Sequence, residues 1–105
     1  MSNFGLKEEE EQLLKSIFSK YDSLNKVIVY GSRAKGTFNE RSDVDLAITE
    51  SNIDRSLIGQ IISEINNSNF PYLLDLQDFS TLKNKQLIDH IDRVGKVFYS
   101  RVNSV

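Results

Sequence analysis

The sequence predicts a single α/β or α+β domain of two or three layers built on a small sheet. Three observations support this prediction. Strand-like and helix-like hydrophobic patterns alternate along the chain, and the sequence contains no internal repeats or low-complexity tracts. The third is size, because 105 residues with 39% hydrophobic side chains suffice for one core but not for two. We therefore expect residues 1–105 to form one domain, with its core between about residues 6 and 100.

The first predicted element is an amphipathic helix over residues 6–24, where apolar side chains recur at spacings of three, four and seven. Four consecutive glutamates at residues 8–11 fall in its first turns, where carboxylates complement the positive end of the helix dipole. Residues 27–30 form a short apolar run that predicts a buried strand, and a glycine follows at once.

The second predicted strand has Val44, Leu46 and Ile48 on one face and polar residues between them. Helical spacing of isoleucines and a leucine then predicts a second long helix over residues 53–65. Three polar residues are available as its N-cap: Ser51, Asn52 and Asp54.

A third strand is predicted over residues 72–77, with the unusual feature of an aspartate, Asp75, in its middle. Apolar residues between 82 and 94 predict a third long helix that ends at Gly95. Residues 97–99 are then predicted to add a short edge strand. The predicted order therefore alternates helices with strands and leaves only the two ends of the chain without an element.

Charge and composition exclude several classes of function. Thirteen basic and fifteen acidic residues give a net charge of −2, which argues against a nonspecific nucleic-acid coat protein, so no direct nucleic-acid binding is expected. The absence of cysteine excludes disulfides, thiolate zinc sites and a cysteine nucleophile. No signal-peptide pattern and no 18-residue apolar run are visible, so we expect a soluble cytoplasmic protein without membrane association.

The most informative segment contains Gly31-Ser32, ten intervening residues, and then Asp43-x-Asp45. Average residue usage gives this pattern a chance occurrence on the order of one in a thousand for a chain of this length. Gly31 follows a predicted strand and can adopt the turn that other residues adopt only with strain. Ser32 would then start a short helix whose free N–H groups can hold a phosphate. Alternatively, Ser32 is only the N-cap of a connecting turn.

Asp43 and Asp45 lie two residues apart on a strand, so their carboxylates project from the same face and repel each other. A cation relieves this repulsion, and Mg²⁺ prefers oxygen ligands. Asp75 is the candidate third carboxylate of a site for two Mg²⁺ ions, which would assist a displacement at phosphorus. Asp78 falls at the strand end, where a turn or cap role fits better. Alternatively, Asp43 and Asp45 belong to a solvated loop and Asp75 to an exposed edge strand.

Three basic residues occur in the same segment, and a triphosphate needs such partners. Arg33 is the first candidate because it directly follows Ser32. Lys35 and Arg41 are equally consistent with exposed positions. His90, the one histidine, is interpreted as a surface residue rather than a catalytic base.

At these residues the chain resembles the minimal nucleotidyltransferase domains of the DNA-polymerase-beta-like superfamily, whose signature is this Gly-Ser, ten residues, Asp-x-Asp. The resemblance extends to Asp75 and to the closing segment around Gly95, so it covers most of the chain. It implies a small mixed sheet flanked by helices. It also implies Mg²⁺ bound by Asp43, Asp45 and Asp75, and a nucleoside triphosphate held by Gly31, Ser32 and Arg33. No residue of the sequence identifies the acceptor.

The resemblance also implies a partner. Related domains are encoded beside a helical HEPN protein, a ribonuclease toxin, and act as its antitoxin by transferring AMP from ATP to a tyrosine. The corresponding hypothesis is a Mg²⁺-dependent nucleotidyltransferase with ATP as donor and a hydroxyl of the HEPN partner as acceptor. A second hypothesis is a non-catalytic module that neutralises its partner by masking it. The third and least favoured is a transferase acting on a small molecule.

Overall fold

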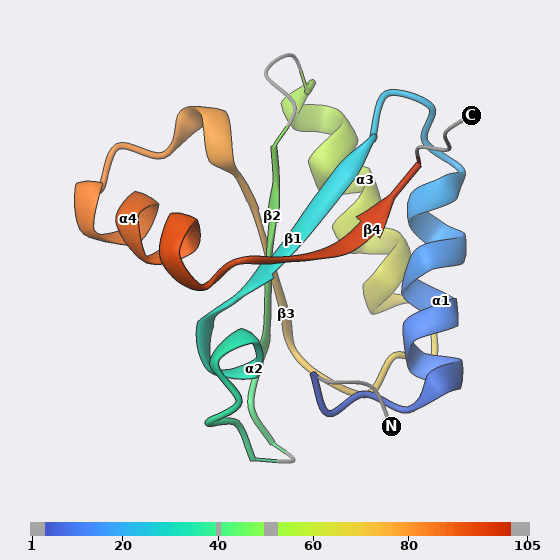
Figure 1. Ribbon diagram of the computed structural model, residues 1–105. Helices are drawn as coiled ribbons and strands as arrows, with labels where there is room; N and C mark the ends of the chain where they lie inside the picture. Colours follow the sequence, from blue (N-terminus) through green and yellow to red (C-terminus); the bar gives the residue numbers. More distant parts are fainter. Residues whose placement is uncertain (1–3, 40, 50–52, 102–105) are drawn as a thin grey trace.

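The computed structural model describes residues 4–39, 41–49 and 53–101, and these form one four-stranded sheet with helices on both faces (Figure 1). The elements follow in the order α1 (Glu8–Ser19), β1 (Lys26–Tyr30), α2 (Gly31–Lys35), β2 (Val44–Ile48), α3 (Arg55–Asn66), β3 (Leu74–Asp78), the 3₁₀ turn η1 (Phe79–Thr81), α4 (Lys85–Val94) and β4 (Lys96–Ser100).

The sheet is mixed, with strand order β3-β2-β1-β4. Strand β1 pairs antiparallel with β2 and with β4, whereas β2 and β3 run parallel. The parallel pair requires a crossover between its strands, and α3 supplies it. The expected mixed sheet flanked by helices is therefore confirmed.

The two faces of the sheet differ in what covers them. The face toward α1 and α3 is the main core, where Val29 and Leu46 pack with helix residues such as Phe18 and Ile61. The opposite face is covered in part by α4, whose Ile91 packs with Ala47. Figure 1 shows α4 on one side of the sheet and α1 and α3 on the other.

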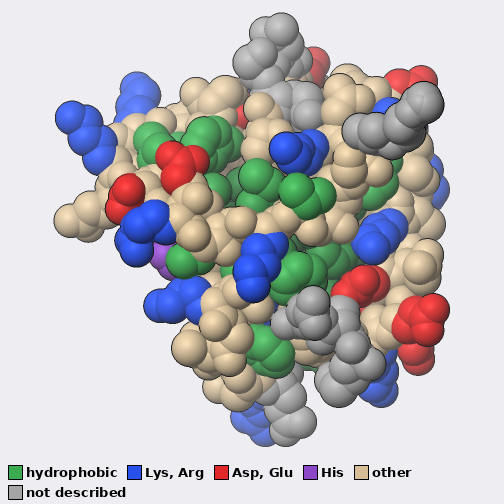
Figure 2. All heavy atoms as spheres, in the orientation of Figure 1, with side chains coloured by type: hydrophobic (Ala, Val, Ile, Leu, Met, Phe, Trp, Pro, Cys, Tyr) green, Lys and Arg blue, Asp and Glu red, His purple; other side chains and the backbone are tan. Residues whose placement is uncertain are grey.

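On the face that Figure 2 shows, charged side chains are scattered over the surface and hydrophobic groups are visible between them. Among the described residues, the exposed large hydrophobics are Leu73 and Val97, which retain 77% and 52% of their accessible surface. In the described ranges, no helix has the length and hydropathy needed to cross a membrane.

The structure shortens the first helix predicted from the sequence. It ends at Ser19, with Lys20 as C-cap, because the chain turns there and Leu24 donates its N–H to the carbonyl of Tyr21. Leu24 is still fully buried. Its spacing from the apolar residues of the helix therefore indicates a buried position, not a helical one. Strand β3 begins at Leu74, two residues later than predicted. Helix α4 begins at Lys85, three residues later than predicted.

The predicted caps can be compared with the observed ones. Asp54 is the N-cap of α3 and accepts a hydrogen bond from the N–H of Ser56. The alternatives Ser51 and Asn52 lie outside the described residues. Asp78 takes the predicted cap role, because its side chain accepts from the N–H of Ser80 at the start of η1.

Candidate active site

The candidate site begins at the junction between β1 and α2. Gly31 is the first residue of α2 and has φ +75°, a conformation that side-chain-bearing residues rarely adopt. Ser32 follows it in the first turn of this short helix, as expected from the sequence, and Gly36 ends the helix with φ +83°. The two glycines therefore set the beginning and the end of the turn that carries Ser32.

Gly31 lies in close contact with Asp45 from the neighbouring strand. A Cβ placed on Gly31 would stand 2.3 Å from Asp45 Oδ2, which is closer than such atoms approach in proteins. Glycine is thus required here for two separate reasons, its backbone conformation and the space taken by the carboxylate. The first half of the motif is packed directly onto the second half.

Strand register aligns three polar side chains in one row. Tyr30 on β1 pairs with Asp45 on β2, and Asp45 pairs with Asp75 on β3. Residues directly opposite one another on paired strands share a face, so the row lies on the face that α4 partly covers. Asp43 precedes β2 by one residue and is two positions from Asp45.

Electrostatics at Asp45 reflect this crowding. Burial raises the pKa of Asp45, and the charges of Asp75 and Asp43 raise it further, while His90 acts in the opposite direction. Asp43 and Asp75 themselves are exposed. Asp45 therefore lies close enough to Asp43 and to Asp75 to interact with each of them through its charge.

The carboxylate of Asp75 is held by two neighbouring side chains. The amide Nε2 of Gln77 donates to both of its oxygens, over 2.9 Å to Oδ1 and 3.0 Å to Oδ2. The hydroxyl of Tyr30 also forms a hydrogen bond with Asp75. Burial raises the pKa of Tyr30, and the charges of Asp75 and Asp45 and this hydrogen bond add to the effect. Tyr30 therefore remains a protonated donor at neutral pH.

His90 was interpreted from the sequence as a surface residue, and the structure corrects this. It is half-buried on α4, and its Nε2 accepts a hydrogen bond from the N–H of Gly31 over 3.2 Å. Its ring lies edge-on against Tyr30, with centroids 6.1 Å apart and planes at 79°. The signal that could have found it is helical spacing, because His90 lies three residues after Leu87 and four before Val94 on the packed face of α4.

The sequence predicts that Arg33 contacts the triphosphate, but in the structure its side chain is buried and bonded to the backbone. It is only 1% exposed, and its guanidinium donates to backbone carbonyls: Nε and NH2 to Ser42 and NH1 to Phe4. It also lies over the rings of Tyr72 and Phe38. With its donors used in this way, the guanidinium ties α2 to two loops instead of facing the carboxylates. Lys35 and Arg41 are exposed.

The donor set has the chemistry that Mg²⁺ prefers, since all three candidate ligands are carboxylates. As the side chains stand, however, no three acidic or histidine residues in the described ranges converge closely enough to hold one ion. Binding of an ion would thus require the carboxylates to draw together.

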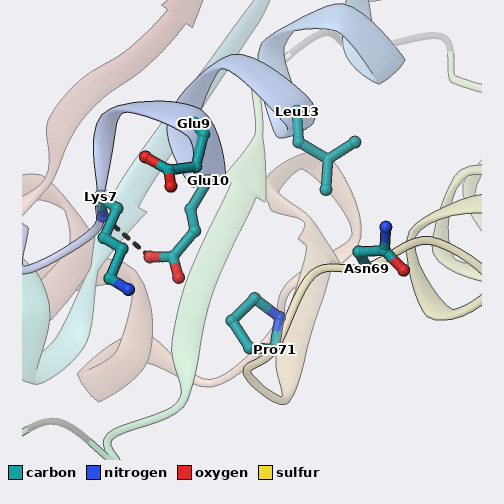
Figure 3. A pocket seen from close by; sticks show the side chains of 6 residues that line it. All are labelled: Lys7, Glu9, Glu10, Leu13, Asn69 and Pro71. Atoms are coloured by element: carbon teal, nitrogen blue, oxygen red, sulfur yellow. Dashed lines mark hydrogen bonds between the residues drawn. The ribbon is translucent and has the colours of Figure 1, made fainter.

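Two cavities lie away from the carboxylates. One of about 490 Å³ separates the start of α1 from the segment before β3, and Figure 3 shows Leu13 and Pro71 on its opposite walls. In the same view, Lys7 donates its N–H to the Glu10 side chain at the start of the helix. A smaller cavity of about 200 Å³ is lined by residues that include Arg55 and Asp78. Neither contains a motif residue.

Together, the fold and the site define a class: a small mixed sheet that carries a Gly-Ser turn beside a row of carboxylates. A protein-family comparison agrees. The family model "Polymerase beta, Nucleotidyltransferase" matches residues 12–104, so the chain belongs to this nucleotidyltransferase family.

Solved structures share the fold at low sequence identity. One is a toxin–antitoxin crystal structure with AMP-PNP, with a TM-score of 0.67, 21% identity and coverage of 90% of this chain and 74% of that chain. A mutant of the toxin–antitoxin MntA–HpeT gives a TM-score of 0.63, 22% identity and coverage of 88% and 71%. A candidate nucleotidyltransferase from Sulfolobus solfataricus gives 0.52, 20% identity and coverage of 87% and 77%. A search of curated proteins finds no match.

Proposed function

We propose that this chain is a Mg²⁺-dependent nucleotidyltransferase that transfers AMP from ATP to a hydroxyl of a partner protein. The observation that carries the proposal is the packing of the Gly31 turn against Asp45, with Asp75 in register beside it. A turn suited to phosphate thereby lies next to a cluster of carboxylates suited to cations. This combination serves chemistry at phosphorus better than a structural role.

Each residue has a part in the proposed reaction. Ser32, in the turn that Gly31 begins, contacts the triphosphate, and Asp43, Asp45 and Asp75 hold the cations. Bound Mg²⁺ would supply neutralisation of the charge on the phosphates. The acceptor oxygen forms a bond to the α-phosphorus, the bond from that phosphorus to the β-phosphate oxygen breaks, and pyrophosphate leaves. Asp75 receives the proton of the acceptor hydroxyl.

The partner is proposed from similarity. Two structures with this fold are toxin–antitoxin structures, one of them with the ATP analogue AMP-PNP. We therefore infer that the acceptor is a tyrosine of a helical HEPN-type toxin and that the chain acts as its antitoxin in the cytoplasm. A protein acceptor is supported by the exposure of Asp43 and Asp75, because exposed carboxylates are accessible to a second molecule.

The experiment uses the purified chain, the product of the neighbouring gene and ATP labelled at the α-phosphate. Label should appear on the partner with wild-type protein and Mg²⁺, and Asp43→Asn should reduce the rate at least a hundredfold. Asp92→Asn is the control, because Asp92 is an exposed carboxylate on α4 outside the site. Absence of transfer by wild type, or full transfer by Asp43→Asn, would contradict the proposal.

The second candidate function is neutralisation by masking. Exposed Leu73 and Val97 favour it, because hydrophobic surface of this kind suits protein contact. The two functions separate in one assay with the double variant Asp43→Asn/Asp45→Asn. Protection from the toxin that persists in this variant favours masking, whereas loss of protection with binding retained favours chemistry.

A further inference from the structure

His90 is the residue near the site to which the proposed reaction gives no role. Its Nε2 accepts the N–H of Gly31 over 3.2 Å, and its ring lies edge-on against Tyr30. Gly31 and Tyr30 are consecutive in the chain and form the junction between β1 and α2. A single imidazole therefore contacts both sides of the junction from which Ser32 follows.

The imidazole is carried by a well-anchored helix. Ile91, the next residue on α4, is 3% exposed and packs against the sheet with Tyr30 and Ala47. The helix is fixed at its end as well, because a Cβ on Gly95 would stand 2.7 Å from a methyl group of Ile28. Because the helix holds His90 in place, the imidazole can fix the position of the turn at Gly31.

The position of this turn matters because Gly31 is already in contact with Asp45. The space at Gly31 is filled by the Asp45 carboxylate, so a shift of the turn displaces a proposed cation ligand. An amide N–H donates one strong hydrogen bond, and that of Gly31 is given to His90. While this bond persists, Gly31 has no N–H to offer a phosphate oxygen, and the contact falls to Ser32.

We propose that His90 is a positioning residue for nucleotide binding, which keeps its hydrogen bond with Gly31 N–H in both the free and the nucleotide-bound protein. Gly31 then supplies backbone conformation, and Ser32 supplies the polar contact with the triphosphate. This inference rests on the proposed function. It differs from the sequence expectation, which assigned the triphosphate to Gly31, Ser32 and Arg33 together.

Two substitutions of His90 distinguish the effect of its hydrogen-bond acceptor from the effect of its aromatic ring. His90→Phe keeps an aromatic ring against Tyr30 but cannot accept a hydrogen bond. His90→Gln loses the ring but places an amide oxygen at a similar distance along the side chain, where it can accept from Gly31. Loss of one such bond should weaken AMP-PNP binding about threefold to tenfold in His90→Phe. Affinity in His90→Gln should stay within about twofold of wild type.

The direct measurement is NMR on wild-type protein, and it benefits from the presence of one histidine in the chain. At about pH 8, long-range ¹H–¹⁵N spectra should show the proton on Nδ1 and none on Nε2. A scalar coupling across the hydrogen bond should connect the Gly31 amide with Nε2. Both signatures should persist when Mg²⁺ and AMP-PNP are added.

Several results would overturn the inference. These are a proton on Nε2, loss of the coupling when AMP-PNP binds, wild-type affinity in His90→Phe, or His90→Gln as weak as His90→Phe. The proposed function has a separate criterion, because it fails if wild type does not bind AMP-PNP with Mg²⁺. If wild type binds and His90→Phe binds equally well, only the role of His90 is refuted. The wild-type spectra require no variant to fold.

Discussion

The α-carbon of Gly31 lies against the carboxylate of Asp45, so that an added Cβ would be 2.3 Å from Oδ2 and 3.2 Å from Cγ. The two halves of the motif have ten residues between them in the sequence, but the antiparallel pairing of β1 with β2 brings them into contact. This contact makes the glycine turn and the carboxylate cluster one unit. It also allows the two reasons for glycine to be measured separately.

Gly31→Ala should destabilise the protein more than Gly36→Ala. Both glycines have positive φ, but a Cβ on Gly36 meets no atom within 4 Å. Strain alone should cost about 1–2 kcal/mol at Gly36, and overpacking should add about 2 kcal/mol at Gly31. Urea denaturation measures both losses. In an Asp45→Ala background the additional loss at Gly31 should disappear, and equal losses in the two single variants would contradict the packing argument.

Asp45→Asn should stabilise the protein at neutral pH when divalent cations are chelated. Burial raises the pKa of Asp45, so the folded state binds this proton more tightly than the unfolded chain. Ionised Asp45 therefore lowers the free energy of unfolding as pH rises from about 3.9 through the raised pKa. Thermal unfolding at several pH values should show the gain at pH 7 and its disappearance near pH 3. Asp92→Asn, an exposed change, should show no such dependence.

Arg33→Met should reduce stability rather than nucleotide affinity. The substitution removes the bonds from the guanidinium to the carbonyls of Ser42 and Phe4, and the loss should be about 3 kcal/mol. Arg93→Met is the matched control, since Arg93 is exposed and pairs with Asp89 on the same helix, and it should change stability by about 0.5 kcal/mol or less. Calorimetry with AMP-PNP on folded protein gives the affinity. Weaker binding with unchanged stability would restore a phosphate-contacting role for Arg33.

Gln77→Met should weaken cation binding and slow AMP transfer. The substitution keeps the side-chain length but removes the donor that holds both oxygens of Asp75. Loss of such a supporting hydrogen bond to a ligand typically costs about 10–100-fold in metal affinity or activity. Mn²⁺ titration followed by electron paramagnetic resonance measures the affinity without turnover. The control is Gln86→Met, at an exposed position of α4, and an effect equal to that of Gln77→Met would contradict the assignment.

Most of the fold could be predicted because each strand is short and its pattern is local. Alternation at Val44, Leu46 and Ile48 identified β2, and the β-branched run before Gly31 identified β1. The short helix after Gly31 also followed from local rules, since Gly31 has a positive φ. Local rules fail at element ends, as at Leu24, where a buried turn residue continues the helical spacing.

The parts of the site that escaped prediction depend on contacts over long sequence separations. The bond between Gly31 and His90 joins residues 59 apart, and Arg33 reaches Phe4 across 29. No local pattern in the sequence specifies either contact. Proximity to Ser32 suggested a phosphate contact for Arg33, but the direction of a helix side chain depends on what packs around it. No pattern in the sequence singles out Gln77 as a partner of Asp75, although the two residues lie two positions apart on β3.

The row of Tyr30, Asp45 and Asp75 has a consequence for how faithfully the chain must fold. Side chains alternate between the faces of a strand, so a slip of one residue between β3 and β2 would turn Asp75 toward α1 and α3 and bring Leu76 out to solvent. Such a slip would bury a charge and expose a leucine at once. Burial of the hydrophobic face therefore also fixes the register of the carboxylates on the opposite face. A chain that reaches its folded state places Asp45 and Asp75 opposite each other.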